Sequence, residues 1–318
     1  MSSSPLAVYT DADDVDLAYG TDVLGAHGFR VLNVGSRDPR QILRSAADAD
    51  ALLVGYAEID DELMAAMPNL RIISLLSSGH DQVDVAAATR RGIWVSTVGH
   101  PAVDEVATHA WMLALACTRR LGFFIDKANP RDWDARPQPA PRRLADLTVG
   151  IVGMGAIGSR VATLAAPGVR RVVGTDSAGL DEVLRAADIL IVCLPLTPQT
   201  RGIIDDRALS LLPTGSHLIN VSRGTVVDTD AVVTALESGR LAGAGLDVFD
   251  TEPLPADHPL TANPAVITTP HVAYLSDASE AEYVRRQADA VVSLWRDGTP
   301  LRAINDLTEP VSTSKGIS

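Results

Sequence analysis

The sequence predicts an α/β fold with two domains, each built on a parallel sheet with helices on its faces. Short apolar runs alternate with helical patterns along most of the chain, and this alternation is typical of parallel sheets. At 318 residues, 46% of them hydrophobic, the chain is long enough to form two cores.

The first domain is expected to form a sheet in which each strand is followed by a short helix. Glycine or proline ends several of these helices, at Gly28, Pro68 and Gly92. Strands are predicted over 6–9, 29–34, 51–54, 70–76 and 93–96, and helices over 16–27, 40–47, 60–67 and 84–91. An amphipathic helix over 284–296 is expected to return to this domain, which then comprises 1–98 and 275–318.

The second domain is expected over 99–274. One long helical pattern over 104–121 leads into it, and further strands are predicted over 148–152, 172–175, 189–194, 217–221, 243–248 and 266–268. Between them, 129–143 is rich in proline, arginine and aspartate. This segment is either a solvated loop or an arm that packs on another subunit, with Trp133 as its anchor.

Charge excludes some classes of partner. The formal net charge of −13 argues against binding to nucleic acid or to an anionic membrane surface. The chain does not start with a signal peptide, and no apolar run is long enough to span a membrane. We therefore expect a cytoplasmic protein, and no metal site is expected.

A glycine motif marks a nucleotide site in the second domain. It follows the apolar strand over 148–152 and opens the helical run over 159–166, which is the context that a dinucleotide-binding motif requires. Its cofactor-binding residues are Gly153, Gly155, Ala156, Ile157 and Gly158. The phosphates would lie on the helix N-terminus, as in a Rossmann-type domain, whereas the alternative is a glycine-rich turn without a ligand.

Asp176 indicates which dinucleotide binds. It lies at the end of the strand over 172–175, where a carboxylate accepts hydrogen bonds from the ribose hydroxyls and repels a 2′-phosphate. Its neighbours Thr175 and Ser177 are neutral. We therefore expect NAD(H) rather than NADP(H).

Three further residues form a candidate catalytic set, because each follows a predicted strand. Arg223 has a planar fork that can hold a carboxylate and polarise a carbonyl. His271 can move a proton, and a carboxylate such as Glu252 on its other nitrogen would set the tautomer and favour the protonated ring. Taken singly, the arginine could be a surface ion pair and the histidine structural.

Together these motifs resemble the D-isomer-specific 2-hydroxyacid dehydrogenase family. The matching stretches are 149–158, 195–197, 220–228, 245–249, 252–260 and 269–273. The resemblance implies a Rossmann-type dinucleotide-binding domain, a flavodoxin-like substrate domain, NAD(H) as cofactor and a homodimer. It implies that Arg223, Glu252 and His271 are catalytic, that Asp247, Pro195 and Thr200 bind the cofactor, and that Ser78 and Gly79 offer amides to the substrate carboxylate.

The chain departs from the family pattern at three places. Only 12 residues separate Asp176 from the strand over 189–194, where the family usually has another short strand. Thr97 and Thr108 replace hinge residues that are asparagine and glutamate in the family. His80 replaces an apolar or aromatic residue, and it either contacts a polar or anionic substrate tail or has a surface or packing role. With Tyr56 and Tyr274 it is a candidate pocket residue.

The implied reaction is interconversion of a 2-oxo acid and a D-2-hydroxy acid by hydride transfer. Two alternatives remain. One is a formate- or phosphite-type dehydrogenase on the same scaffold, although formate dehydrogenase has a glutamine in the motif where this chain has Glu252. The other is an NAD(H)-sensing regulator that resembles the C-terminal-binding proteins.

Overall fold

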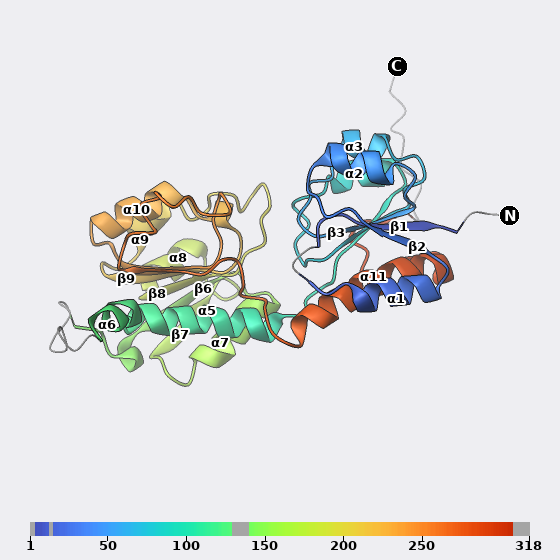
Figure 1. The fold of residues 1–318 in the computed structure, drawn as a ribbon. Helices are drawn as coiled ribbons and strands as arrows, with labels where there is room; N and C mark the ends of the chain where they lie inside the picture. Colours follow the sequence, from blue (N-terminus) through green and yellow to red (C-terminus); the bar gives the residue numbers. More distant parts are fainter. Residues whose placement is uncertain (1–3, 13–14, 129–139, 308–318) are drawn as a thin grey trace, which may run out of the picture. The chain divides into compact units, whose positions relative to one another are not determined.

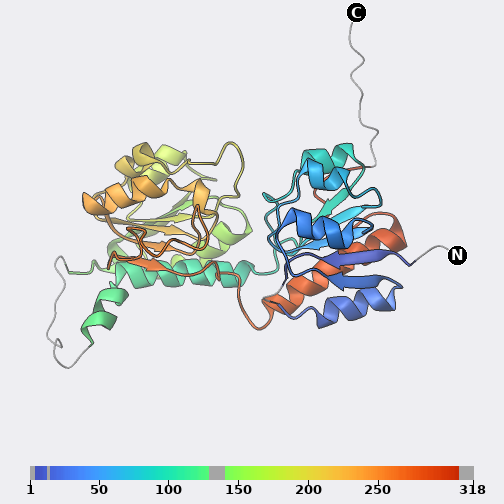
Figure 2. The same cartoon turned by 45° about the horizontal axis from the view of Figure 1, so that its top comes forward.

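The computed structural model describes residues 4–12, 15–128 and 140–307. The chain divides into two compact units, of which unit 1 comprises Met1–Pro101 with Ser276–Ser318 and unit 2 comprises Ala102–Leu275 (Figures 1 and 2). Trp133 and most of the predicted arm lie outside the described residues.

Unit 1 is built on a five-stranded sheet in which every neighbouring pair is parallel. The strands lie in the order β2 (Arg30–Asn33), β1 (Leu6–Tyr9), β3 (Ala51–Val54), β4 (Ile72–Leu75) and β5 (Trp94–Ser96). The two inner strands β3 and β4 are buried along their whole length, as expected for a sheet covered on both faces. The order 2-1-3-4-5 is that of flavodoxin-like folds, which confirms the prediction.

Helices cover both faces of this sheet (Figure 1). One face carries α1 (Ala18–Ala26) and α11 (Ser279–Asp297), which pack against each other and on the sheet. The other face carries α2 (Pro39–Ala46), α3 (Asp61–Ala65) and α4 (Val85–Arg90). Each of these last three helices begins at an aspartate whose side chain accepts a hydrogen bond from the first turn.

The C-terminal helix α11 is an integral part of unit 1. The buried Gln287 side chain donates to the Val54 and Ser74 carbonyl oxygens at 3.2 and 2.9 Å, and the Ser74 hydroxyl donates to the Gln287 carbonyl at 2.9 Å. The helix begins at Ser279, earlier than the predicted 284, because Ser276 and Ser279 cap each other's backbone amides. The sequence pattern missed this first turn because it is polar.

Unit 2 is built on a six-stranded parallel sheet. Its strands lie in the order β11 (Val266–Thr268), β10 (Leu241–Leu246), β9 (Ser216–Asn220), β8 (Ile189–Val192), β6 (Thr148–Val152) and β7 (Arg171–Gly174). The order reverses between β6 and β8, as in doubly wound nucleotide-binding folds. Only one helix, α8 (Leu180–Ala186), lies within the described segment 177–188, so β7 forms the edge and the additional family strand is missing, as the sequence predicts.

Helices cover both faces of the second sheet as well (Figure 1). One face carries α5 (Val103–Thr118) and α7 (Ala156–Ala165), and the other carries α8, α9 (Asp206–Leu211) and α10 (Thr229–Glu237). Short 3₁₀ turns occur at Leu144–Asp146 and Gly224–Val226. In the ranges that the structure describes, no helix is long and apolar enough to cross a membrane.

One predicted helix needs correction, and two further helices of unit 2 were not predicted. The predicted helix over 104–121 is two helices, because Arg120 adopts a left-handed conformation, with φ 55°, between α5 and α6 (Leu121–Lys127). The apolar pattern continues through this break and therefore hides it. Helices α9 and α10 were missed, although Asp205 and Asp228 cap their first turns and are recognisable start signals.

Candidate active site

The three predicted catalytic residues follow three neighbouring strands of unit 2. Arg223 comes after β9, Glu252 after β10 and His271 after β11, and these strands pair side by side in parallel. Their carboxyl ends therefore meet at one edge of the sheet, where doubly wound folds bind ligands. The sheet order thus gathers residues that are far apart in the sequence.

His271 and Glu252 form a direct pair. The His271 Nδ1 and Glu252 Oε2 atoms are 2.7 Å apart, and the two side chains are 35% and 37% exposed. Burial would raise the pKa of Glu252, but hydrogen bonds from His271 and from the Phe249 amide, with the charges of His271 and Arg223, lower that pKa below its usual value. Glu252 is therefore a carboxylate at neutral pH. Among the described residues none hydrogen-bonds to His271 Nε2, which is left for a ligand.

The half-buried Arg223 is held through its backbone and by a close approach of two loops. The Asn220 side-chain Nδ2 donates to the Arg223 carbonyl at 3.0 Å, and Arg223 Nη1 donates to the Ser222 carbonyl at 3.0 Å. The adjacent Gly224 packs so tightly on the backbone of Phe249 that a Cβ atom would overlap the Phe249 carbonyl carbon. This glycine therefore lets the arginine loop reach the loop that carries Glu252.

Asp247 fixes the loop that carries His271. Its carboxylate is fully buried and accepts hydrogen bonds from the Thr269 hydroxyl at 2.5 Å, the Val272 amide at 3.0 Å and the Ala273 amide at 2.9 Å. The His271 amide donates to the Asp247 carbonyl at 2.8 Å, and His271 has a left-handed backbone with φ 56°. In this structure the residue predicted to contact nicotinamide thus positions the histidine loop.

Sequence reasoning missed His109, which extends this network. From helix α5 its Nε2 atom lies 3.0 Å from the Thr269 hydroxyl and 3.6 Å from an Asp247 carboxylate oxygen. No local pattern points to such a role, since His109 lies inside an otherwise ordinary helix. Only the packing of α5 on β10 and β11 brings it to the site.

The glycine motif has the geometry of a phosphate cradle. Gly153 has φ 99°, and a Cβ atom there would lie 2.7 Å from the Cys193 carbonyl oxygen. At Gly158 a Cβ atom would overlap the Gly153 carbonyl oxygen, so helix α7 packs close to the turn. By contrast, a Cβ atom at Gly155 would meet nothing within 4 Å. Space is thus open at the one glycine that should face the pyrophosphate.

The remaining cofactor residues surround this cradle. The amides of Ala156 and Ile157, in the first turn of α7, donate to no acceptor in the described part of the chain, so they can receive a phosphate. Asp176 is exposed in the turn after β7. After β8, the Thr200 hydroxyl donates to the Pro195 carbonyl at 2.6 Å and holds that loop closed. The chain's own groups therefore fit a dinucleotide.

The predicted substrate residues Ser78, Gly79, His80 and Tyr56 belong to unit 1. They lie in the loops after β4 and β3, at the carboxyl edge of its sheet. The Ser78 and Gly79 amides have no acceptor among the described residues. His80 and Tyr56 are exposed, whereas Tyr274 is half-buried, close in sequence to His271 in unit 2.

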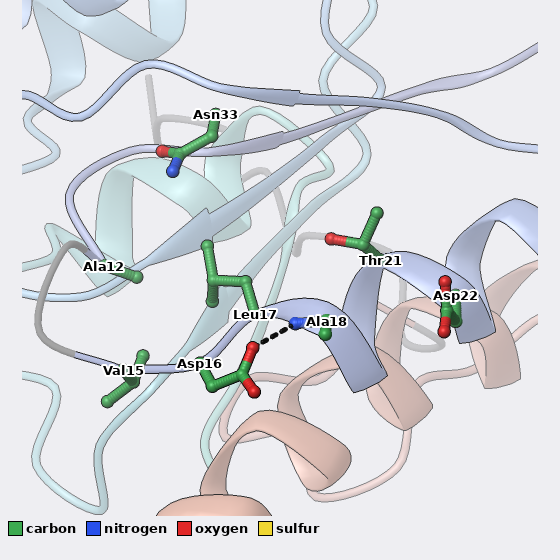
Figure 3. Close-up of a pocket in the computed structure, with 8 residues that line it drawn as sticks. All are labelled: Ala12, Val15, Asp16, Leu17, Ala18, Thr21, Asp22 and Asn33. Carbon is green, nitrogen blue, oxygen red and sulfur yellow. Dashed lines mark hydrogen bonds between the residues drawn. The ribbon is translucent and has the colours of Figure 1, made fainter.

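A separate concave surface of about 450 Å³ lies at the start of α1 (Figure 3). It is lined by Ala12, Val15, Asp16, Leu17, Ala18, Thr21, Asp22 and Asn33. Asp16 is used locally, since its side chain accepts a hydrogen bond from the Ala18 amide at 2.9 Å. None of the predicted site residues lies there.

Comparison with known proteins agrees with this geometry. Residues 111–273 match the NAD-binding domain of D-isomer specific 2-hydroxyacid dehydrogenases, which confirms the predicted cofactor, NAD(H). Over 287 residues the chain is 34% identical to glyoxylate reductase from Aeropyrum pernix, covering 83% of this chain and 85% of that relative. Over 254 residues it is 36% identical to D-3-phosphoglycerate dehydrogenase from Mycobacterium leprae, covering 75% of this chain and 48% of that longer relative.

A solved structure supports the same assignment. The NADPH-dependent glyoxylate/hydroxypyruvate reductase from Sinorhizobium meliloti, in complex with NADP and malonate, superposes with a TM-score of 0.85 at 29% identity. The match covers 96% of this chain and 98% of that protein. With the glycine cradle and the sheet order described above, these similarities show that the chain is an NAD(P)-dependent oxidoreductase and belongs to the D-isomer specific 2-hydroxyacid dehydrogenase family.

Proposed function

We propose that the protein interconverts a small 2-oxo acid and the corresponding D-2-hydroxy acid, with His271 as the proton donor and acceptor. The observation that carries this proposal is the 2.7 Å contact between His271 Nδ1 and Glu252 Oε2. A carboxylate on Nδ1 favours the protonated ring and turns Nε2 into the proton-donating atom. The two relatives named above as glyoxylate or glyoxylate/hydroxypyruvate reductases reduce acids of this type, as their names state.

The proposed mechanism divides the work among the three residues. NADH, when bound, supplies the hydride that reduces the carbonyl carbon C2. Arg223 binds the substrate carboxylate and carbonyl oxygen, which orients C2 and stabilises the negative charge that develops on the oxygen. His271 gives its Nε2 proton to that oxygen, and Glu252 stabilises the ring charge before the transfer. In the oxidation direction the same nitrogen takes the proton back.

Unit 1 is the proposed substrate domain, and unit 2 the proposed dinucleotide-binding domain. The Ser78 and Gly79 amides would bind the substrate carboxylate, since both donors lack acceptors in the described structure. Tyr56, His80 and Tyr274 would face the substrate side chain. Asp247 would add a contact to the nicotinamide carboxamide to its role in holding the histidine loop.

NADH is the proposed physiological form, because Asp176 is exposed at the end of β7. A carboxylate at this position accepts hydrogen bonds from the ribose hydroxyls and repels a 2′-phosphate. Because β7 is the edge strand, no further strand among the described residues borders the position expected for the adenosine. We therefore expect moderate cofactor affinity with a clear preference for NADH over NADPH.

The decisive experiment measures NADH oxidation with glyoxylate, pyruvate, hydroxypyruvate, phenylpyruvate and phosphonopyruvate, and NADPH in parallel. Turnover of at least one acid is expected, and His271→Gln should lower that rate roughly 10²–10⁴-fold. A His271→Gln variant with more than half of the wild-type rate would contradict the assignment. NADH binding without turnover of any acid would favour a regulator or an oxidiser of another substrate.

A cytoplasmic location stays a prediction. We also propose a homodimer formed through an apolar face of unit 2. Along α5 and α6, the side chains of Met112, Leu121, Phe124 and Ile125 are 46%, 48%, 38% and 67% exposed. Exposed large apolar side chains on two consecutive helices are typical of protein interfaces. Light scattering should give twice the chain mass, and Ile125→Glu should shift the protein towards the monomer, whereas a wild-type monomer would refute the proposal.

A further inference from the structure

We propose that Arg37 is a recognition site for a negatively charged group at the far end of the substrate. The protein would then favour 2-oxo acids that carry a second carboxylate or a phosphonate over short neutral ones. This inference rests on the proposed function. It concerns the side-chain end of the substrate, which the triad and the Ser78–Gly79 amides do not contact.

A buried carboxylate holds Arg37 in place. Asp11 follows β1 with its side chain 3% exposed, and its Oδ2 atom lies 3.3 Å from Arg37 Nε. The same carboxylate accepts the Thr10 hydroxyl at 2.5 Å and the amides of Gly55 and Tyr56 at 3.1 and 2.7 Å. Three other donors already stabilise the charge of Asp11. Asp11 therefore orients Arg37 through the Nε atom, and the two terminal nitrogens of the guanidinium do not hydrogen-bond to it.

Arg37 also lies over an aromatic ring. Its guanidinium carbon is 4.4 Å from the centroid of Tyr56, which has its backbone amide on Asp11. The Arg37 side chain is 65% exposed, and its two terminal nitrogens donate to no acceptor among the described residues. Stacking and the Nε contact fix the plane of the fork, so little conformational entropy is lost when an anion binds to the terminal nitrogens.

The position of Arg37 suits the far end of a substrate bound at the Ser78–Gly79 loop. Both the Tyr56 loop and the Ser78–Gly79 loop leave the carboxyl edge of the sheet, from the adjacent strands β3 and β4. Gln82 joins them, since its side chain donates to the Gly55 carbonyl and the Ser77 hydroxyl, both at 3.3 Å. Arg37 follows β2, but its contacts with Asp11 after β1 and with Tyr56 after β3 bring the guanidinium over these two strands. Neighbouring strands are about 4.8 Å apart, so β3 and β1 lie one and two spacings, roughly 5–10 Å, to the side of β4.

A lateral offset of this size is comparable to the length of a short 2-oxo acid with an anionic tail. The substrate carboxylate would occupy the amides, and the second anion would reach the Arg37 fork two or three carbons away.

The test compares substrates with and without the tail in matched variants. We would measure kcat and KM for phosphonopyruvate and oxaloacetate against glyoxylate and pyruvate, in wild type, Arg37→Ala and Arg37→Lys. Arg40→Ala is the control, because it removes an exposed arginine from the same segment that contacts neither Asp11 nor Tyr56. Arg37→Ala should lower kcat/KM for the tailed acids about 10–150-fold, mostly through KM, and change the others less than about threefold.

Arg37→Lys should lie between wild type and alanine, because it keeps the charge but loses the fork. Equal loss for tailed and short acids, no loss at all, or the same loss in Arg40→Ala would overturn the inference. Calorimetric titration of phosphonopyruvate and pyruvate in the presence of NAD⁺ gives the same comparison without turnover. If no acid is turned over but phosphonopyruvate binds more weakly to Arg37→Ala than to wild type, the proposed reaction is refuted. The proposed Arg37 recognition site is then still supported.

Discussion

Replacing Glu252 with glutamine removes the carboxylate charge from the candidate active site and changes the shape of the side chain very little. The two side chains have the same shape, and the glutamine oxygen can still accept the Phe249 amide, as Glu252 Oε1 does at 2.9 Å. The glutamine NH2 group then lies where Oε2 accepted from His271 Nδ1, so the variant loses both the negative charge and the acceptor that favour the protonated ring. It therefore measures how much the carboxylate favours proton donation by the ring.

The contact geometry sets the size of the effect. At 2.7 Å the His271–Glu252 bond has the length of a charge-assisted hydrogen bond, which contributes about 1.5–3 kcal/mol when it is protected from water. Both side chains are somewhat more than one-third exposed, so screening by water reduces this to about 1–2 kcal/mol. In the reduction direction kcat/KM should therefore fall about 5–30-fold near neutral pH.

The pH at which this comparison is valid follows from Glu252 itself. Its folded-state pKa lies below the ordinary 4.5, so the carboxylate is charged at any higher pH and loses its charge only as the pH falls through that lower value. An assay near neutral pH thus compares a fully charged glutamate with a neutral glutamine. Titration of Glu252 does not contribute to the difference.

A double-mutant cycle makes the reasoning refutable. Because Glu252 acts through His271, the double variant Glu252→Gln with His271→Gln should be as slow as His271→Gln alone. Steady-state NADH oxidation on all four proteins, with the best 2-oxo acid, gives the coupling between the two residues. Additive losses would show that Glu252 acts independently of the imidazole, and the proposed proton relay would then be wrong.

Three further outcomes are expected. Gly224→Ala should lower activity by about 10²-fold or more, because the alanine Cβ atom would push the loop that carries Arg223 away from the backbone of Phe249. A wild-type kcat in this variant would contradict the argument. Circular dichroism checks that the variant folds. Asp176→Ala should raise NADPH use relative to NADH by about tenfold, measured as the ratio of the two kcat/KM values; an unchanged ratio would remove Asp176 from cofactor selection. Burial, with nearby arginine charges, lowers the pKa of His217 from 6.5 to about 4. Between these two pH values the unfolded state binds more protons than the folded state. The free energy of unfolding should therefore fall as the pH drops from 6.5 towards 4, by at most about 3 kcal/mol. Urea unfolding at several pH values should show this slope in wild type and a shallower one in His217→Gln, and equal slopes would refute it.

Several features of this protein could be predicted from local sequence patterns. The strand β3 was predicted to the residue because an apolar run between polar segments has few other conformations available, and the glycine motif because only glycine tolerates the turn at Gly153 and the contact at Gly158. The candidate triad was predicted because each member lies in the loop after a strand. The break at Arg120 was not, since apolar spacing continues across it.

Tertiary structure alone decided which of these residues meet and what holds them. The 2.7 Å contact of His271 with Glu252, the buried Asp247 under the histidine loop, and His109 reaching Thr269 from α5 join segments separated by many residues. The stacking of Arg37 on Tyr56, oriented by Asp11, likewise joins three loops after three different strands. Sequence patterns report the periodicity and capping of single elements, whereas such contacts depend on strand order and helix packing, which arise only when distant segments bury their apolar faces together.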